Sequence, residues 1–262
     1  MQKQNGNGLS KFLILLYGVI SYFIFLGTFL YAIGFVGNFL VPKSIDYGFQ
    51  GGTGNAWLIN ILLLSLFAVQ HSVMARRGFK KWWTKIVPRP IERSTFVLFS
   101  SLVLILLFIF WRPITDAVWN VQGLPGILLT ALSFIGWFIV LLGTFLINHF
   151  NLFGLQQVYL NFKNREEAFP KFVKPLFYKV VRHPLMLGFI IAFWATPQMT
   201  LGHLLFAVAT TGYILLAIQL EERDMVKMHG NNYVKYQQEV SQIIPLPPKK
   251  EVEVLQKNFQ NR

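Results

Sequence analysis

The sequence predicts an all-α fold, a polytopic integral membrane bundle with four spans followed by a C-terminal helical hairpin. Of the 262 residues, 54% are hydrophobic and only 13% are charged, about half the charged fraction of an ordinary soluble domain. The apolar residues also lie in long uninterrupted runs, and about 20 such residues cross a bilayer as a helix. This composition excludes a disordered chain and argues against a soluble globular enzyme.

The four spans follow from the apolar runs in chain order. No charged residue lies between Lys11 and Lys43, and this run is too long for a cleaved signal peptide. Three further apolar runs predict the second, third and fourth spans, at Ala56–Met74, Ser94–Trp111 and Leu124–Asn148.

The last apolar stretch, Leu185–Leu220, predicts two helical arms. A single straight helix of this length would be about 54 Å long, nearly twice the hydrocarbon thickness of a bilayer. Pro197 lacks a backbone donor and clashes with the preceding turn, so a break is expected there. We therefore expect arms at Leu185–Ala195 and Thr200–Leu220. A polar helical extension follows to about Met228, and then a break at Gly230 and a further helical segment.

The formal net charge of +13 follows the loops. The loop after the second span and the segment from Phe150 to Pro184 are strongly basic, whereas the loops at residues 43–46 and 112–116 are nearly neutral. By the positive-inside rule, the basic loops and both termini are cytoplasmic, as expected for a multi-pass protein of a bacterial inner membrane. Membrane lipid is therefore an expected partner, and nucleic acid is not. With no cysteine and no histidine pair at ligand spacing, no metal is expected.

Two polar motifs lie at the cytoplasmic ends of the two arms. Arg182-His183-Pro184 directly precedes the first arm, and Glu221-Glu222-Arg223-Asp224 closes the second. Helical periodicity directs Glu221 and Glu222 to different sides, so one carboxylate can face the bundle. A hairpin brings the motifs together although they lie about 40 positions apart. The alternative interpretations are a helix cap for the first motif and a solvated helix end for the second.

Two histidines lie at the cytoplasmic ends of predicted spans, His71 beside Gln70 and His149 beside Asn148. Polar side chains at such depth usually face the bundle interior, and histidine is the natural proton acceptor near neutral pH. Interfacial hydrogen bonding is the alternative role for each.

These motifs resemble a known family. Pro175–Gly188 reads P-L-F-Y-K-V-V-R-H-P-L-M-L-G and resembles the R-H-P element of the isoprenylcysteine carboxyl methyltransferase-like, NnrU-like superfamily. Glu221-Glu222 with Gly230, Tyr233 and Tyr236 is similar to its E-E…G…Y…Y element. Within it, the segments 148–157, 70–76 and 92–95 resemble the bacterial membrane methanethiol S-methyltransferases. The resemblance covers about residues 56–248 and departs from the pattern at Asn151, Gln156 and Met186.

The resemblance implies methyl transfer from S-adenosylmethionine to methanethiol, giving dimethyl sulfide, with other small thiols or methaneselenol as further candidate acceptors. It implies one domain at residues 1–248, with a cytoplasmic cofactor pocket built by about residues 148–248, and a loosely ordered tail at 249–262. The implied cofactor-binding residues are Tyr178, Arg182, His183, Pro184, Leu187, Gly188, Glu221, Glu222, Tyr233 and Tyr236. The implied substrate-binding residues are Asn148, Phe150, Phe153 and Gln157, and the catalytic candidates are His149, His71, Glu222 and Arg223.

The chemistry of the reaction agrees with these residue types. A carboxylate accepts hydrogen bonds from ribose hydroxyls or the cofactor ammonium, while Arg182 or N–H groups at a helix start take the cofactor carboxylate. A thiol reacts as the thiolate, so the substrate must lose its proton or bind ionised. The acceptor sulfur must lie about 3–3.5 Å from the methyl carbon.

Three other functions remain open on the sequence. The same fold suits methylation of a lipid amine or a prenylcysteine carboxyl group. A haem-binding membrane protein would use His71 and His149 as axial ligands, but would leave Glu221-Glu222 and the two tyrosines without a role. A passive structural or transport protein would bind neither group. The sequence does not indicate an oligomeric state.

Overall fold

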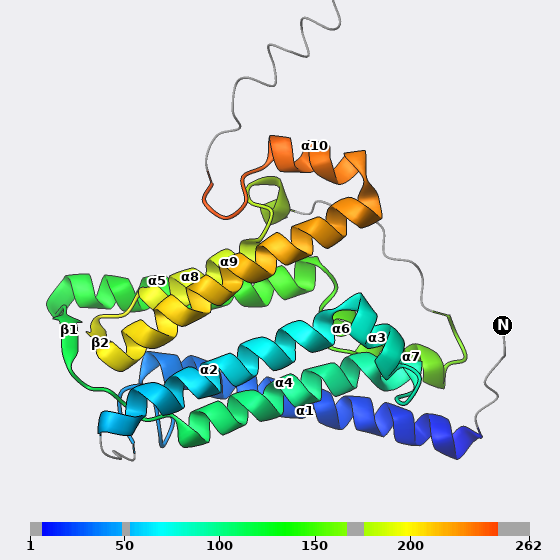
Figure 1. Cartoon of the computed structure of the whole chain (residues 1–262), viewed down its shortest axis with the longest axis horizontal. Helices are drawn as coiled ribbons and strands as arrows, with labels where there is room; N and C mark the ends of the chain where they lie inside the picture. The colour runs from blue at the N-terminus through cyan, green and yellow to red at the C-terminus, as the bar shows by residue number, and fades with distance from the viewer. Residues whose placement is uncertain (1–6, 49–52, 167–175, 246–262) are drawn as a thin grey trace, which may run out of the picture.

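The computed structural model describes residues 7–48, 53–166 and 176–245, and these residues are mainly helical (Figure 1). The elements in chain order are α1 (Gly8–Gly37), α2 (Thr53–Ala75), α3 (Arg77–Trp83), α4 (Arg89–Phe110), β1 (Ala117–Asn120), α5 (Gly123–Leu146), α6 (His149–Leu152), α7 (Leu155–Phe162), the 3₁₀ turn η1 (Leu176–Lys179), α8 (Pro184–Trp194), β2 (Gln198–Thr200), α9 (Leu201–His229) and α10 (Asn231–Glu239).

Five of these helices are long and apolar enough to cross a membrane, namely α1, α2, α4, α5 and α9. Many of their large apolar side chains are exposed, Phe23 and Leu216 among them. Exposed apolar side chains along helices long enough to span a bilayer indicate contact with lipid. The chain is therefore an integral membrane protein, and the number of spans and their orientation stay predictions.

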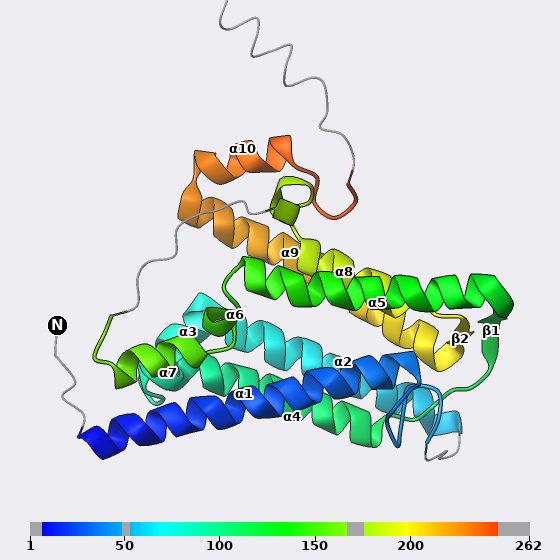
Figure 2. The same ribbon diagram turned by 180° about the vertical axis from the view of Figure 1, so that it is seen from behind.

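The long helices form two layers (Figures 1 and 2). One layer contains α1, α2 and α4, and the other contains α5, α8 and α9. Both views place α3, α6, α7 and α10 at one end of the bundle, and β1 with β2 at the other. We call these the site end and the sheet end.

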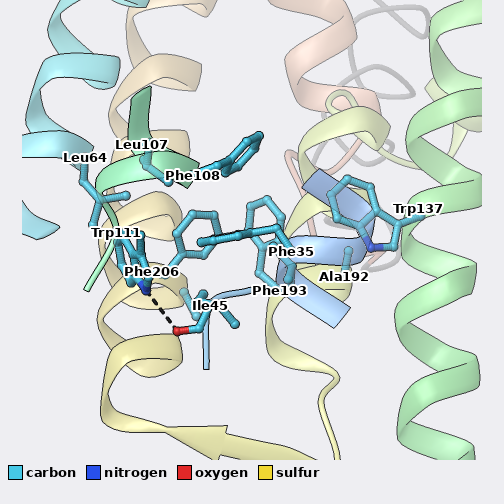
Figure 3. Packing of buried hydrophobic residues seen from close by; sticks show 12 residues of the cluster. Phe35, Ile45, Leu64, Leu107, Phe108, Trp111, Trp137, Ala192, Phe193 and Phe206 are labelled. Carbon is cyan, nitrogen blue, oxygen red and sulfur yellow. Dashed lines mark hydrogen bonds between the residues drawn. The ribbon is translucent and has the colours of Figure 1, made fainter. Parts of the chain in front are cut away.

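The main hydrophobic core joins the two layers and includes the loop after α1. Phe35 of α1 and Phe206 of α9 both pack edge-on against Trp111, which is fully buried. The indole N–H of Trp111 donates to the carbonyl oxygen of Ile45 at 3.0 Å (Figure 3). Burying this donor with a partner avoids the cost of an unsatisfied polar group. The core thus anchors the loop between α1 and α2 as well as the layers.

The α5–α8 contact is a close approach of two backbones at Gly136 and Gly188. A Cβ atom at Gly136 would lie 2.7 Å from the carbonyl oxygen of Gly188, and one at Gly188 would lie 2.8 Å from that of Gly136. Small residues permit such approaches between membrane helices, where van der Waals packing replaces the hydrophobic effect. Gly188, expected beside the cofactor, therefore lies against a helix.

The sheet end adds two short strands that the all-α prediction did not contain. β1 and β2 pair antiparallel with an irregular register, and the carbonyl oxygen of Pro197 accepts from Val121 N–H at 2.8 Å. The break expected at Pro197 is present, and pairing satisfies backbone groups that helix geometry cannot satisfy there.

The helix boundaries differ from the predicted spans by a few residues. α1 ends at Gly37, before Lys43, because Asn38 adopts a left-handed conformation with φ of 59° and its N–H returns to Gly34. α5 ends at Leu146 and Asn148 is left-handed with φ of 82°. The extension of α9 and the break at Gly230 are as predicted, whereas the tail at 249–262 lies outside the described residues.

Candidate active site

The first polar cluster is centred on the carboxylate of Glu222, near the C-terminal end of α9. Arg182 donates to it twice, from Nε to Oε1 at 2.7 Å and from Nη2 to Oε2 at 3.2 Å. His183 Nε2 lies 3.0 Å from Oε1, and Gln237 Nε2 donates to Oε2 at 2.8 Å. These four donors fill the four lone-pair positions of a carboxylate. The side chain of Glu222 is 8% exposed, so this is a buried and fully paired charge.

Backbone pairing holds Arg182 and His183 in place before α8 begins. Arg182 N–H donates to the carbonyl oxygen of Ser241 at 2.8 Å, and His183 N–H donates to that of Gln242 at 3.1 Å. Arg182 Nη1 also donates to the carbonyl oxygens of Gln237 and Val240. Hydrogen bonds thus join the R-H-P motif to α10 and to the segment after it. The prediction that this motif contacts the Glu221-Glu222 motif is confirmed.

The tyrosines of α10 are buried beside this cluster. Tyr236 donates its hydroxyl to the carbonyl oxygen of Tyr178 at 2.5 Å, and its ring meets Tyr233 edge-on at 5.7 Å. Burial raises the pKa of Tyr236 to about 12, and it also raises the pKa of Tyr178 and Tyr233. All three are therefore neutral phenols at physiological pH.

The two adjacent carboxylates have different surroundings. Glu221 has a side chain that is 54% exposed, and its Oε2 atom lies 3.9 Å from Nδ1 of His183. Arg223 is exposed, so the structure does not bring it to Glu222. Leu187 packs with Ile214 and Ile218 in a small core. Of the two adjacent carboxylates, Glu221 is therefore the one that is accessible to a ligand.

The second polar cluster is centred on His149, the first residue of α6, which is 5% exposed. Tyr22 of α1 lies with its hydroxyl 2.9 Å from Nε2, and Thr144 of α5 lies with its hydroxyl 2.8 Å from Nδ1. The ring of Phe145 stacks on the imidazole at 4.3 Å, and Phe153 meets it edge-on at 4.8 Å. Burial lowers the pKa of His149, so the ring is neutral near pH 7.

The predicted substrate residues lie in or next to α6, and they differ in exposure and in hydrogen bonding. Asn148 accepts from Asn151 N–H and donates to Gln156, so it caps α6 at an exposed position. Phe153 stacks on Phe25 with ring centroids 3.9 Å apart, next to His149. Phe150 also contacts the imidazole, but it is 53% exposed. Gln157 donates to the carbonyl oxygen of Asn151 at 3.4 Å.

His71 lies between α2 and α4, in surroundings distinct from those of His149. Its Nδ1 atom is 3.1 Å from the hydroxyl of Ser100, and its ring packs on Phe67 and Phe96. Among the described contacts, none joins His71 to His149. The structure therefore separates the two histidines that the sequence left equivalent.

The α5–α8 contact lies between the two clusters. Leu185, two residues after His183, packs on Gly143, where an added Cβ atom would lie 3.0 Å from Leu185 Cγ. Gly143 directly precedes Thr144, the partner of His149. The contact between α5 and the start of α8 thus links the two clusters.

Sequence reasoning did not find Tyr22, Thr144 or Gln237. The first two are polar residues in apolar spans, a signal that was used only for histidines. Gln237 lies one position after Tyr236, and only its contact with Glu222 distinguishes it from its neighbours. Among the described residues, no group of three His, Asp or Glu side chains is placed to hold a metal.

The structure is thus that of a membrane helical bundle with a paired carboxylate cluster and a buried histidine. The family model described as "NnrU protein" matches residues 59–230. The chain belongs to this family. Its relatives of about 50% identity are methanethiol S-methyltransferases.

Three relatives show the extent of the similarity. Methanethiol S-methyltransferase 2 of Bradyrhizobium diazoefficiens is 53% identical, covering 90% of this chain and 91% of its own. The methanethiol S-methyltransferase of Crocosphaera subtropica is 53% identical, with 95% and 100% covered. That of Mycobacterium tuberculosis is 51% identical, with 91% and 98% covered. No solved structure matches the chain.

Proposed function

We propose that this protein is a membrane thiol S-methyltransferase that transfers a methyl group from S-adenosylmethionine to methanethiol, giving dimethyl sulfide. The observation that carries the proposal is about 50% identity to methanethiol S-methyltransferases over nearly the whole chain. The geometry at the site end supports it with a carboxylate for the cofactor and a neutral histidine for the substrate proton.

The cofactor carries ribose hydroxyls, an ammonium and a carboxylate, and the residues at and beside the first cluster offer one acceptor for the hydroxyls or the ammonium and N–H donors for the carboxylate. Glu221 accepts hydrogen bonds from the hydroxyls or the ammonium, because its carboxylate is exposed beside the cluster. Arg182 is occupied by Glu222 and two carbonyl oxygens. The cofactor carboxylate then binds the N–H groups of Leu185 and Met186, which helix geometry leaves without intrahelical partners at the start of α8. When bound, the cofactor supplies an electrophilic methyl group.

Glu222 is in this proposal a positioning residue. Its carboxylate holds Arg182, His183 and α10 together, and so orients the start of α8 and the tyrosines of α10. In this proposal Tyr178, which is partly exposed, offers a neutral ring face to the adenine, whereas Tyr233, which is 3% exposed, packs against Tyr236.

His149 is the proton acceptor in this proposal. Its ring is neutral and enclosed by Phe145 and Phe153, which suit a small apolar thiol. A dry pocket also favours the reaction, because the charges of thiolate and sulfonium disappear as the methyl group moves.

The site end is cytoplasmic in this proposal. It carries the basic residues of α3 and the start of α4, namely Arg77, Lys80, Lys81, Arg89 and Arg93, whereas the loops at the sheet end are nearly neutral. The positive-inside rule places such an end in the cytoplasm, as in a bacterial inner membrane. A small apolar thiol then reaches the site through the lipid or from the cytoplasm.

The structure disfavours the haem alternative. Both ring nitrogens of His149 lie within hydrogen-bond distance of hydroxyls, so neither is open for iron. The lipid-amine and prenylcysteine alternatives are outcomes of the test below.

The test is methyl transfer by the purified protein with methyl-labelled S-adenosylmethionine. Methanethiol, longer alkyl thiols and a prenylcysteine are compared as acceptors, and label in dimethyl sulfide is the expected result. Exclusive transfer to the prenylcysteine, or no transfer to any small thiol, would overturn the proposed acceptor. A haem absorption band without S-adenosylmethionine binding would overturn the class of reaction.

A further inference from the structure

The hydrogen bonds of His149 determine which ring nitrogen carries the proton. The hydroxyl of Thr144 lies 2.6 Å from the carbonyl oxygen of Leu141, and two oxygens at this distance need a proton between them. A carbonyl only accepts, so Thr144 donates its single proton to Leu141. The Thr144 oxygen, 2.8 Å from Nδ1, must therefore accept from an N–H of His149.

It follows that Nε2 of neutral His149 is the acceptor. Since Nδ1 carries the proton, the hydroxyl of Tyr22, 2.9 Å away, donates to Nε2. The oxygen of Tyr22 then has lone pairs free to accept from another donor. Among the contacts of the described residues, none fixes the tautomer of His71 in this way, because Ser100 can donate to its Nδ1 or accept from it.

The rings around His149 leave Tyr22 as the route to Nε2. Phe145 covers one face of the imidazole, with the planes 7° from parallel. Phe150 and Phe153 contact it edge-on, and Tyr22 itself meets it at 5.7 Å between centroids. A molecule that gives a proton to His149 therefore meets the hydroxyl of Tyr22 first.

We propose that Tyr22 is a catalytic residue that relays the proton of the thiol substrate to His149. This inference rests on the proposed function. As the thiol sulfur forms its bond to the methyl carbon of the sulfonium donor, its S–H proton passes to the Tyr22 oxygen and the Tyr22 proton passes to Nε2. The donor sulfur keeps the electron pair of the C–S bond that breaks. The products are a thioether, the neutral demethylated donor and an imidazolium, which returns its proton to water through the same hydroxyl.

The test compares Tyr22→Phe with the control Tyr17→Phe. Tyr17 lies on the same helix and hydrogen-bonds the hydroxyl of Thr95 at 3.0 Å, so the control removes a similar hydroxyl outside the relay. Two acceptors are used at neutral pH, methanethiol and methaneselenol, because a selenol is far more acidic and arrives ionised. Tyr22→Phe is expected to lower kcat with methanethiol about 10²-fold or more. It should change kcat with methaneselenol less than about threefold, and Tyr17→Phe should change neither.

Equal losses with both acceptors would show a structural role for Tyr22 and overturn the relay, as would full activity with methanethiol. A second measurement needs no turnover. Nitrogen NMR of ¹⁵N-histidine protein, assigned by the signal lost in His149→Phe, is expected to show the Nδ1–H tautomer. In Tyr22→Phe the pKa of His149 should rise, because the neutral ring loses a donor. If the wild-type protein shows the Nε2–H tautomer, the relay is overturned whatever the activity. If the wild-type protein shows the Nδ1–H tautomer but methylates neither acceptor, the proposed acceptor is overturned, and with it the relay of a thiol proton.

Discussion

The charge of Glu222 can be removed with little change of shape by Glu222→Gln, and the structure sets the expected cost. Arg182, whose side chain is 9% exposed, would then lie buried beside a neutral amide. Removing one partner of a buried ion pair costs about 3–5 kcal/mol. Because the amide oxygen of Gln keeps one acceptor, we expect about 3 kcal/mol, the lower end of this range.

The assay is unfolding of the purified protein in detergent micelles, followed by tryptophan fluorescence. The matched control is Glu221→Gln, whose side chain is 54% exposed and is expected to change stability by less than about 0.5 kcal/mol. The double variant Arg182→Met with Glu222→Leu should be less destabilised than the sum of the single variants, because no charge is left unpaired. A loss of less than 1 kcal/mol in Glu222→Gln, or additive losses in the double variant, would refute the description of this cluster as a buried pair.

Three further results are expected. Burial lowers the pKa of His149 from the ordinary value of 6.5, so the imidazole stays neutral to a lower pH. The acidic limb of the pH profile of kcat/KM should therefore lie below pH 6.5, and it should disappear in His149→Ala. Gly188→Ala places a Cβ atom 2.8 Å from the backbone of Gly136 and should cost about 1–3 kcal/mol of stability, whereas Gly27→Ala meets no atom within 4 Å and should cost none. Glu221→Gln should raise the Kd for S-adenosylmethionine about tenfold, measured by calorimetry, since a charge-assisted hydrogen bond contributes about 1.5–3 kcal/mol; unchanged binding would remove Glu221 from the site.

Much of the fold could be predicted because membrane helices are visible in composition. Runs without charge identify α1, α2, α4, α5 and α9. In lipid, backbone N–H and C=O groups must be hydrogen-bonded within the chain and apolar side chains are favoured, so an apolar run forms a helix. The break at Pro197 is equally local. The strands β1 and β2 were missed because they pair residues about 80 positions apart, a contact that no local pattern reports.

The candidate site could be predicted in its members but not in their roles. The R-H-P motif and Glu222 were expected to meet, and they do. Their expected use as direct cofactor ligands stays a prediction, and the pairing of Arg182 with Glu222 favours a positioning role for both. Whether a carboxylate is free or paired depends on side chains from α10 and the segment after it.

Hydropathy and motif spacing were enough to predict a helical membrane protein, the places of its long helices and the family that it resembles. These properties depend on hydropathy and motif spacing, which are local. The packing of the helices was needed to show which of two adjacent glutamates is buried, which histidine lies between two hydroxyls, and that Tyr22 is one of its partners. The position of a proton and the accessibility of a charge depend on partners from other helices, and no local sequence pattern reports which partners packing brings together.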